Sequence, residues 1–213
     1  DFLISCPPYK RSANGMAELT QLLESLASSK ANVFTDPLYL SGLAPAGNGL
    51  LDWHQNQPNN PDAPALMAYA ALLSGITLAQ VGLGSVHGLA SPLGAFFPIP
   101  HGVVCGTLVA VATDINIKAL LTRAPQHPAL HKYAEVGRLL AGKREIDDLA
   151  AQRALVAVLE DWTKRMSLPL LSDFGVTSRD IPRIVANSRG SSMKTNPIIL
   201  TDDEIADIIQ RRL

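Results

Sequence analysis

The sequence has little of what would assign it to a secreted, nucleic-acid-binding or membrane-spanning class. Its 213 residues include two cysteines, Cys6 and Cys105, far apart and without CxxC spacing, so we expect both to be reduced in a cytoplasmic protein. Aromatic residues make up 5%, and the net charge is −1 with no basic block. Neither nucleic acid nor an anionic membrane surface is therefore an expected partner. Every apolar run is broken by Gly, Pro or polar residues before about 18 positions, which predicts no membrane span.

What the chain does have is apolar residues at helical spacing. Its hydrophobic fraction of 47% and charged fraction of 17% are typical of a globular protein. The spacing predicts helices from Asn14 as N-cap, from 35–37, and over 63–81, 103–123, 127–140 and 145–166. Capping-box patterns at 177–180 and 201–204 predict two short helices near the end. With no strand pair or repeat in the pattern, residues 1–213 are predicted to form a single all-α domain of roughly eight helices.

Two features of this pattern predict the environment of particular segments. The helix over 63–81 is apolar on nearly every face, which predicts that it is buried. The stretch "QNQPNNPDAP" before it is polar and rich in proline, which predicts an exposed loop.

Several short motifs point to chemistry but lack the context that the chemistry needs. Residues 82–87 nearly match a dinucleotide-binding glycine loop, but the third glycine is His87 and a helix precedes the loop. Residues 191–194 match S-x-x-K without the partner motifs of that serine chemistry. His127 and His131 have ligand spacing, yet one precedes Pro128 at an expected helix start and the other lies on an expected solvated face. These motifs predict structure rather than function.

The stretch "GLGSVHGLASPLGAFFPIPHG" at 82–102 differs, because it places two histidines in a Gly- and Pro-rich interruption between apolar helices. Glycines flank His87, while Pro100 and Gly102 flank His101. Glycine lets backbone approach closely, and proline stiffens the chain and stops a helix. Neutral imidazole is a common ligand for zinc and iron, so these two side chains are candidate metal ligands.

This stretch resembles the signature of the iron-containing (group III) alcohol dehydrogenase family, G-x-x-H-x-x-x-x-P-L-G followed by I-P-H-G. "NGMAELTQLLES" is similar to the family's earlier helix motif G-M-D-A-x-x-H-x-x-E, and "MKTNP" fits the family's C-terminal end. The resemblance covers nearly the whole chain. It implies the dehydroquinate synthase-like helical domain that forms the C-terminal half of a two-domain dehydrogenase.

The resemblance also implies a metal site that this sequence only partly keeps. In the family an Asp and a His on the first helix bind the metal with the two signature histidines. The latter correspond to His87 and His101, but the Asp position is Ala17 and the first His position is Gln21. Glu18 is displaced by one position, about 100° around a helix. With Gln21 as a weak amide ligand, Fe²⁺ or Zn²⁺ is expected to bind weakly or not at all; without metal, His87 or His101 would donate a proton to the carbonyl oxygen.

For the whole enzyme, the resemblance implies an NAD(P)-dependent oxidoreductase that interconverts small alcohols with aldehydes or ketones. The cofactor would be bound mainly by an N-terminal nucleotide-binding domain, whose βαβ pattern this chain lacks, and the parent would be a homodimer. The residues implied at the substrate wall near the two histidines are Leu89, Ser91, Phe96 and Phe97. The alternative is a non-catalytic helical module, kept for packing or dimerisation, with a degenerate metal site.

Overall fold

A computed structural model describes residue 3 and residues 5–55 and 60–213 of the chain. Within this part every regular element is helical, as the sequence predicts: nine α-helices, one more than expected, and three 3-10 turns. The α-helices are α1 (Pro8–Ala27), α2 (Asp36–Gln55), α3 (Ala63–Val81), α4 (Ser85–Phe96), α5 (His101–Arg123), α6 (Pro128–Ala141), α7 (Asp148–Arg165), α8 (Ile181–Ala186) and α9 (Asp202–Gln210). The 3-10 turns are η1 (Ser172–Phe174), η2 (Ser178–Asp180) and η3 (Met193–Thr195).

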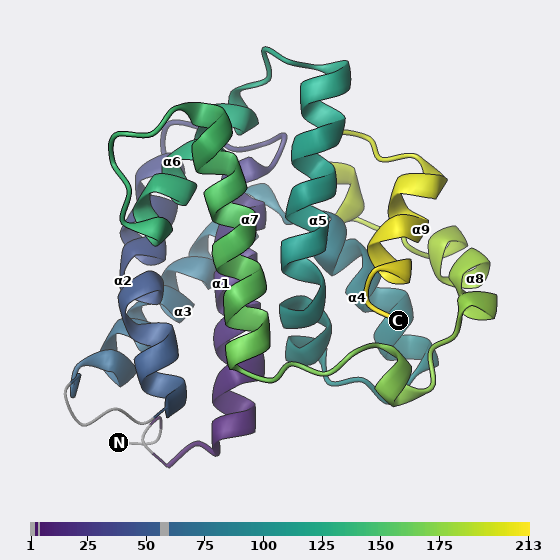
Figure 1. The fold of residues 1–213 in the computed structure, drawn as a ribbon, viewed down its shortest axis with the longest axis horizontal. Coiled ribbons are helices and arrows are strands. Elements are labelled where there is room, and N and C mark those ends of the chain that lie inside the picture. Colours follow the sequence, from purple (N-terminus) through teal and green to yellow (C-terminus); the bar gives the residue numbers. More distant parts are fainter. Residues whose placement is uncertain (1–2, 4, 56–59) are drawn as a thin grey trace.

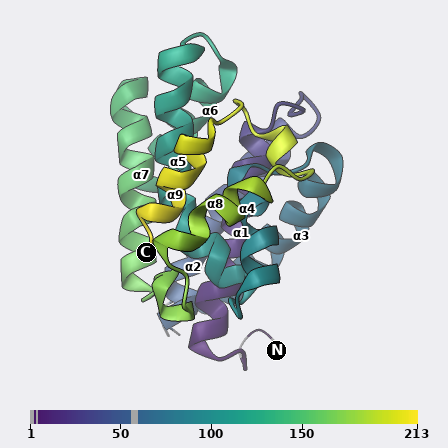
Figure 2. The same cartoon turned by 90° about the vertical axis from the view of Figure 1, so that its right-hand side faces the viewer.

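Helix α5 lies at the centre and separates two groups of helices (Figure 1). On one side α1, α2, α3, α6 and α7 form a bundle with its own apolar core, to which α5 contributes Val109 and Leu120. On the other side α4 and α9 pack on α5, and α8 packs on α4 and α9, around a second core to which α5 contributes Leu108 and Ile115 (Figure 2). Burial of α5 by both groups explains why its sequence is apolar on nearly every face.

The helix boundaries agree with the sequence pattern except at the first helix. The expectation that Asn14 is an N-cap is wrong, because α1 begins at Pro8 and Asn14 is an exposed residue in its interior. Pro7 and Pro8 occupy the N-cap and first helical positions, where the fixed φ of proline suits a helix start and no amide hydrogen is lost. The two predicted capping boxes are confirmed at Thr177 and Thr201, each with both reciprocal hydrogen bonds.

The interruption at 82–102 is itself mostly helical, since α4 fills Ser85–Phe96 with Pro92 in its interior. Only the glycine-rich entry before it and the short segment 97–100, which holds Pro98 and Pro100, are non-helical. The polar loop predicted over 55–64 lies partly outside the described residues. Of that stretch, Gln55 ends α2, 60–62 are not helical, and α3 begins at Ala63.

The prediction that the helix over 63–81, α3, is buried on nearly every face is wrong. Tyr69, Leu72 and Ile76 are exposed on its outer face, while Met67 and Ala70 face the core. Both α3 and α5 are long and apolar enough to cross a membrane, with 33% and 83% of their windows buried in the fold. Length and composition of this kind are also found in core helices of soluble proteins, so they are weak evidence for a span.

A close contact between α1 and α5 places the second signature histidine. A Cβ atom at Gly102 would lie 2.5 Å from the carbonyl oxygen of Ala13, so only glycine allows this approach. His101, one residue earlier, is thereby held at the start of α5 beside the first half of α1. The close packing of α5 on α1 therefore explains the glycine of the I-P-H-G motif.

Candidate metal centre

The first signature histidine, His87, lies in the first turn of α4, and the start of that helix is capped by distant side chains. The first backbone amide, of Ser85, donates to the Asn196 side-chain oxygen at 3.0 Å. The next amide, of Val86, donates to Glu24 Oε1 at 2.6 Å. Gly84 makes this possible, because a Cβ there would lie 2.9 Å from both the Asn196 and the Glu24 oxygens. Asn196, from the C-terminal "MKTNP" motif, therefore helps to position His87.

Glu24 also binds the His87 side chain. The distance from Glu24 Oε2 to His87 Nδ1 is 2.6 Å, and both side chains are buried. Because Nδ1–H donates to the carboxylate, the Nε2 atom of a neutral His87 carries a lone pair. Glu24 therefore fixes the direction and the tautomer of the imidazole from its α1 side.

His87 Nε2 points toward a cysteine that lies between the two histidines. Cys105 Sγ is 3.6 Å from His87 Nε2 and 3.5 Å from His101 Nε2. His101 and Cys105 are separated by four positions on α5 and so share one helix face. The two imidazole rings have their centroids 5.3 Å apart and are tilted by 53°. Helices α1, α4 and α5 thus bring together two imidazoles, a thiol and a carboxylate.

These groups shift one another's protonation. Burial lowers the pKa of His87, but its hydrogen bonds to Cys105 and Glu24 outweigh burial and raise the pKa to about 10. Burial raises the pKa of the Cys105 thiol, but the hydrogen bonds from His101 and His87 outweigh it and lower the pKa. The hydrogen bond to Cys105 also raises the pKa of His101. In the metal-free chain the arrangement favours a thiolate beside imidazolium.

The family's metal-binding set does not fit the residues on α1. Ala17 offers no donor atom, and the side-chain oxygen of Gln21 already accepts a hydrogen bond from Ser74 at 3.0 Å. An Asp-plus-three-His shell of the kind that holds iron in this family therefore has only two of its four ligands here. Ala17, Gln21 and His101 do line one cavity.

This cavity has a volume of about 580 Å³ and lies between the first half of α1 and the start of α5. Its lining residues are Tyr9, Lys10, Ala13, Asn14, Ala17, Glu18, Gln21, Pro100, His101, Gly102 and Val103. His101 is exposed and belongs both to the cavity and to the cluster, whereas His87 and Cys105 are buried behind it. The cluster is therefore accessible from the cavity at the side of His101.

Glu18 is the carboxylate of this cavity. Its Oε2 atom is buried and has no hydrogen-bond partner among the described residues. Burial raises the pKa of Glu18 from 4.5 to about 7. Glu18 lies outside the group of ligand atoms formed by His87, His101 and Cys105.

We expect Glu18 to make the stability of the chain depend on pH. The folded chain holds the Glu18 proton up to about pH 7, whereas the unfolded chain releases it near pH 4.5. Stability should therefore fall between these values by up to about 3 kcal/mol. Glu18→Gln should remove this fall and be the more stable form at pH 8, with little difference at pH 4. Urea denaturation at both pH values, with exposed Glu145→Gln as the control, measures it; equal gains from the two variants would contradict it.

The residues expected at the substrate wall do not line this cavity. Leu89 is fully buried in the core around α4, and Ser91 is exposed on that helix. Phe96 and Phe97 are half-buried at the end of that helix. The Cζ atom of the Arg183 guanidinium lies 3.6 Å from the centroid of the Phe96 ring. The structure thus brings His87 and His101 together, but these four side chains are not among those that line the cavity containing His101.

The other histidines have structural partners. The His127 side chain caps α6 by accepting from the Ala129 amide. His131 lies on the exposed face of α6, with Asp148 3.0 Å from its Nδ1 atom. His54 Nδ1 is 2.8 Å from the Ser12 hydroxyl. Among the described residues, His87, His101 and Cys105 form the single group of three metal-ligating side chains that converge.

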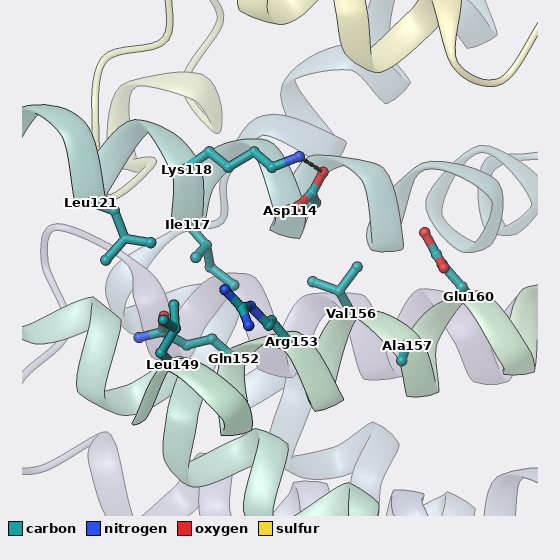
Figure 3. A pocket seen from close by; sticks show the side chains of 10 residues that line it. All are labelled: Asp114, Ile117, Lys118, Leu121, Leu149, Gln152, Arg153, Val156, Ala157 and Glu160. Carbon is teal, nitrogen blue, oxygen red and sulfur yellow. Dashed lines mark hydrogen bonds and ion pairs between the residues drawn. The ribbon is translucent and has the colours of Figure 1, made fainter. Parts of the chain in front are cut away.

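A second cavity, of about 330 Å³, lies between α5 and α7 (Figure 3). Apolar residues such as Ile117 and Val156 line it, and charged residues such as Lys118 and Arg153 also face it. Asp114, which belongs to this lining, pairs with Lys118 at 2.8 Å. Because no histidine or cysteine lines this cavity, the candidate chemistry belongs to the cavity beside α1.

Two residues of the site are missing from the sequence-based expectation. Cys105 is not part of the signature, but its i, i+4 spacing from His101 on an expected helix is a signal that could have found it. Glu24 ends the motif resembling G-M-D-A-x-x-H-x-x-E, so its position was visible. Its partner on α4 lies far along the chain, and no local pattern identifies that pairing.

Comparisons with known proteins agree with this architecture. The profile of the Fe-containing alcohol dehydrogenase family, C-terminal, matches residues 12–213. Alcohol dehydrogenase 4 of Schizosaccharomyces pombe is 30% identical over 205 residues, which are 96% of this chain and 46% of that protein. Lactaldehyde reductase of Escherichia coli strain K12 is 30% identical over 186 residues, which are 86% of this chain and 46% of that protein.

A solved structure shows the same fold. The crystal structure of 1,3-propanediol oxidoreductase superposes with a TM-score of 0.88 at 27% identity, covering 99% of this chain and 53% of that chain. The chain therefore spans about half the length of the relatives that it matches.

Proposed function

This chain belongs to the Fe-containing alcohol dehydrogenase family, and we propose that it supplies the metal and substrate side of an NAD(P)-dependent oxidoreductase. The reaction would interconvert small alcohols with aldehydes or ketones. The observation that carries the proposal is the meeting of His87 and His101, 5.3 Å apart between ring centroids, beside a 580 Å³ cavity. The names of the relatives, an alcohol dehydrogenase, a lactaldehyde reductase and a 1,3-propanediol oxidoreductase, support the reaction class.

The cofactor, NAD or NADP, would be held mainly by a nucleotide-binding domain on the N-terminal side of this one. The described residues contain no strand, so they offer no βαβ unit for a dinucleotide. The cavity beside α1 would then form one wall of a cleft between the two domains, in a parent that is a cytoplasmic homodimer. Clefts at domain interfaces are common positions for small substrates.

The chemistry at this wall concerns the substrate oxygen. When bound, NADH or NADPH would supply a hydride to the carbonyl carbon, and the negative charge that develops on the substrate oxygen would have to be neutralised. His101 is the member of the cluster that lines the cavity, so the oxygen would face His101. His87 lies behind it, buried and fixed by Glu24, and would support the wall without contacting the substrate.

The test uses the complete polypeptide encoded around this segment. We expect it to reduce short aldehydes or ketones with NADH or NADPH, followed by loss of nicotinamide absorbance. His101→Ala should lower kcat/KM by about 100-fold or more, because acid or electrophilic assistance at the oxygen contributes at least that much. The 213-residue chain alone should show no saturable NAD(P)H binding in calorimetry.

The outcomes separate this proposal from the non-catalytic alternative. Activity that is unchanged in His101→Ala would contradict the role given to this cavity. A folded complete polypeptide without cofactor binding or activity, in which this chain mediates dimerisation, would support the packing module instead. Micromolar binding of NAD(H) by the chain alone would contradict the division of labour between two domains.

A further inference from the structure

Three ligand atoms converge between α4 and α5 where the family's own set is incomplete. His87 Nε2, His101 Nε2 and Cys105 Sγ all lie within 4.8 Å of one another. His87 and Cys105 are buried, and His101 is exposed at the cavity. Ala17 stands where the family has an anionic Asp ligand. The Cys105 thiolate can provide an anionic ligand for a divalent ion instead.

The distances suit one small tetrahedral ion. Zinc binds cysteine sulfur at about 2.3 Å and histidine nitrogen at about 2.0–2.1 Å, so a tetrahedral site separates sulfur from nitrogen by about 3.6 Å. The observed separations of Cys105 Sγ from His87 Nε2 and from His101 Nε2 are 3.6 and 3.5 Å. The two nitrogens are within 4.8 Å of each other, and the exposed His101 ring can move toward the buried one.

Glu24 orients the buried His87 imidazole as a metal-binding histidine is usually oriented. Histidines that bind metals usually donate their second N–H to a carboxylate or carbonyl oxygen, which fixes the tautomer and orients the ring. Glu24 has this relation to His87 Nδ1 at 2.6 Å, and leaves Nε2 directed at Cys105. Glu24 is itself held by the Val86 amide at 2.6 Å.

We propose that His87, His101 and Cys105 form a zinc site of two imidazoles and one thiolate, with its fourth position open to the cavity at His101. Thiolate and imidazole together favour Zn²⁺ over Fe²⁺, whereas the family's Asp is a harder ligand. Three protein ligands and one open position are the arrangement of a catalytic zinc, which polarises a substrate oxygen. The catalytic use of the ion rests on the proposed function, but the binding of the ion does not.

The experiment measures zinc binding by the 213-residue chain itself. After removal of metal under reducing conditions, the chain should take up one equivalent of Zn²⁺ in competition with a chromogenic chelator. Cys105→Ser should weaken binding at least 10-fold, and His101→Ala should abolish stoichiometric uptake. The matched control is Cys6→Ser, since Cys6 is the other cysteine and lies outside the cluster; its affinity should equal that of the wild type.

Cobalt gives a readout that needs neither activity nor a folded Cys105 variant. Co²⁺ bound to the wild-type chain, and to Cys6→Ser, should show a near-ultraviolet thiolate-to-cobalt charge-transfer band. Stoichiometric binding without this band, or equally tight zinc binding by Cys105→Ser, would mean a histidine-only site and overturn the proposal. A folded chain, checked by circular dichroism, that takes up no stoichiometric metal would overturn it as well. An inactive complete polypeptide that still binds zinc through Cys105 would instead count against the proposed reaction.

Discussion

Replacing Gly137 by alanine should destabilise the chain by about 2 kcal/mol, although alanine is the better helix former. Gly137 lies in α6 where the backbone of α7 passes closest. A Cβ atom there would lie 1.9 Å from the carbonyl oxygen of Ala151 and 2.7 Å from its carbonyl carbon. These are backbone atoms, so no side-chain rotation relieves the overlap and the two helices must separate. Overpacking of this kind costs about 1–3 kcal/mol or more, against a propensity gain of about 1 kcal/mol.

Thermal and urea denaturation measure the Gly137→Ala effect. For a chain of this size, a loss of about 2 kcal/mol lowers Tm by roughly 4–8 °C. Gly75→Ala is the matched control, because Gly75 is inside α3 and a Cβ there would meet nothing within 4 Å. The control should be neutral or stabilising by up to about 1 kcal/mol. A Gly137→Ala variant as stable as Gly75→Ala would show that α6 and α7 are not packed this closely.

Local signals in the sequence are enough to predict most of the fold. Helical spacing and the two capping boxes identify elements whose stability depends on residues close together in the chain. The first helix begins earlier than predicted because Pro7 and Pro8 are themselves a signal for a helix N-terminus, stronger here than the polar Asn14. The burial of α3 differs from the prediction because the sequence shows that a helix face is apolar but does not show whether another element covers that face.

At the candidate site, too, local motifs predict one part, and contacts between distant segments determine the other. The signature motifs predict that His87 and His101 come together, and their spacing on either side of a Pro-rich stop agrees with this. The chemistry between them depends on Cys105, which the signature does not include, and on Glu24, which reaches α4 across the fold. The capping of α4 by Asn196 is likewise a tertiary contact. Such contacts follow from helix packing, which a single sequence does not specify.

Replacing Glu24 by alanine should be the most damaging change at the site, with a loss of about 3–5 kcal/mol in unfolding free energy. Three buried groups would lose their acceptor together: the Val86 amide, the His87 amide and His87 Nδ1. Unpartnered buried donors cost about 1–3 kcal/mol each, partly offset where water enters. Breaking a buried charged pair by removing one partner has a cost in the same range. Urea denaturation, with Glu145→Ala as the exposed control, measures the loss.

Glu24→Gln separates the support of α4 from the orientation of His87. The amide oxygen of glutamine can still accept from the Val86 backbone, so the stability loss should be about 1–2 kcal/mol. The amide NH₂ would face His87 Nδ1 and donate to it, which disfavours the imidazolium and leaves the proton of the neutral ring on Nε2. Nitrogen NMR of the metal-free chain should show the doubly protonated His87 ring replaced by a neutral ring with its proton on Nε2, and zinc affinity should fall 10–100-fold because Nε2 of that ring offers no lone pair. If the protonation of the ring and the affinity are unchanged in Glu24→Gln, Glu24 supports α4 alone and does not position His87 for a ligand.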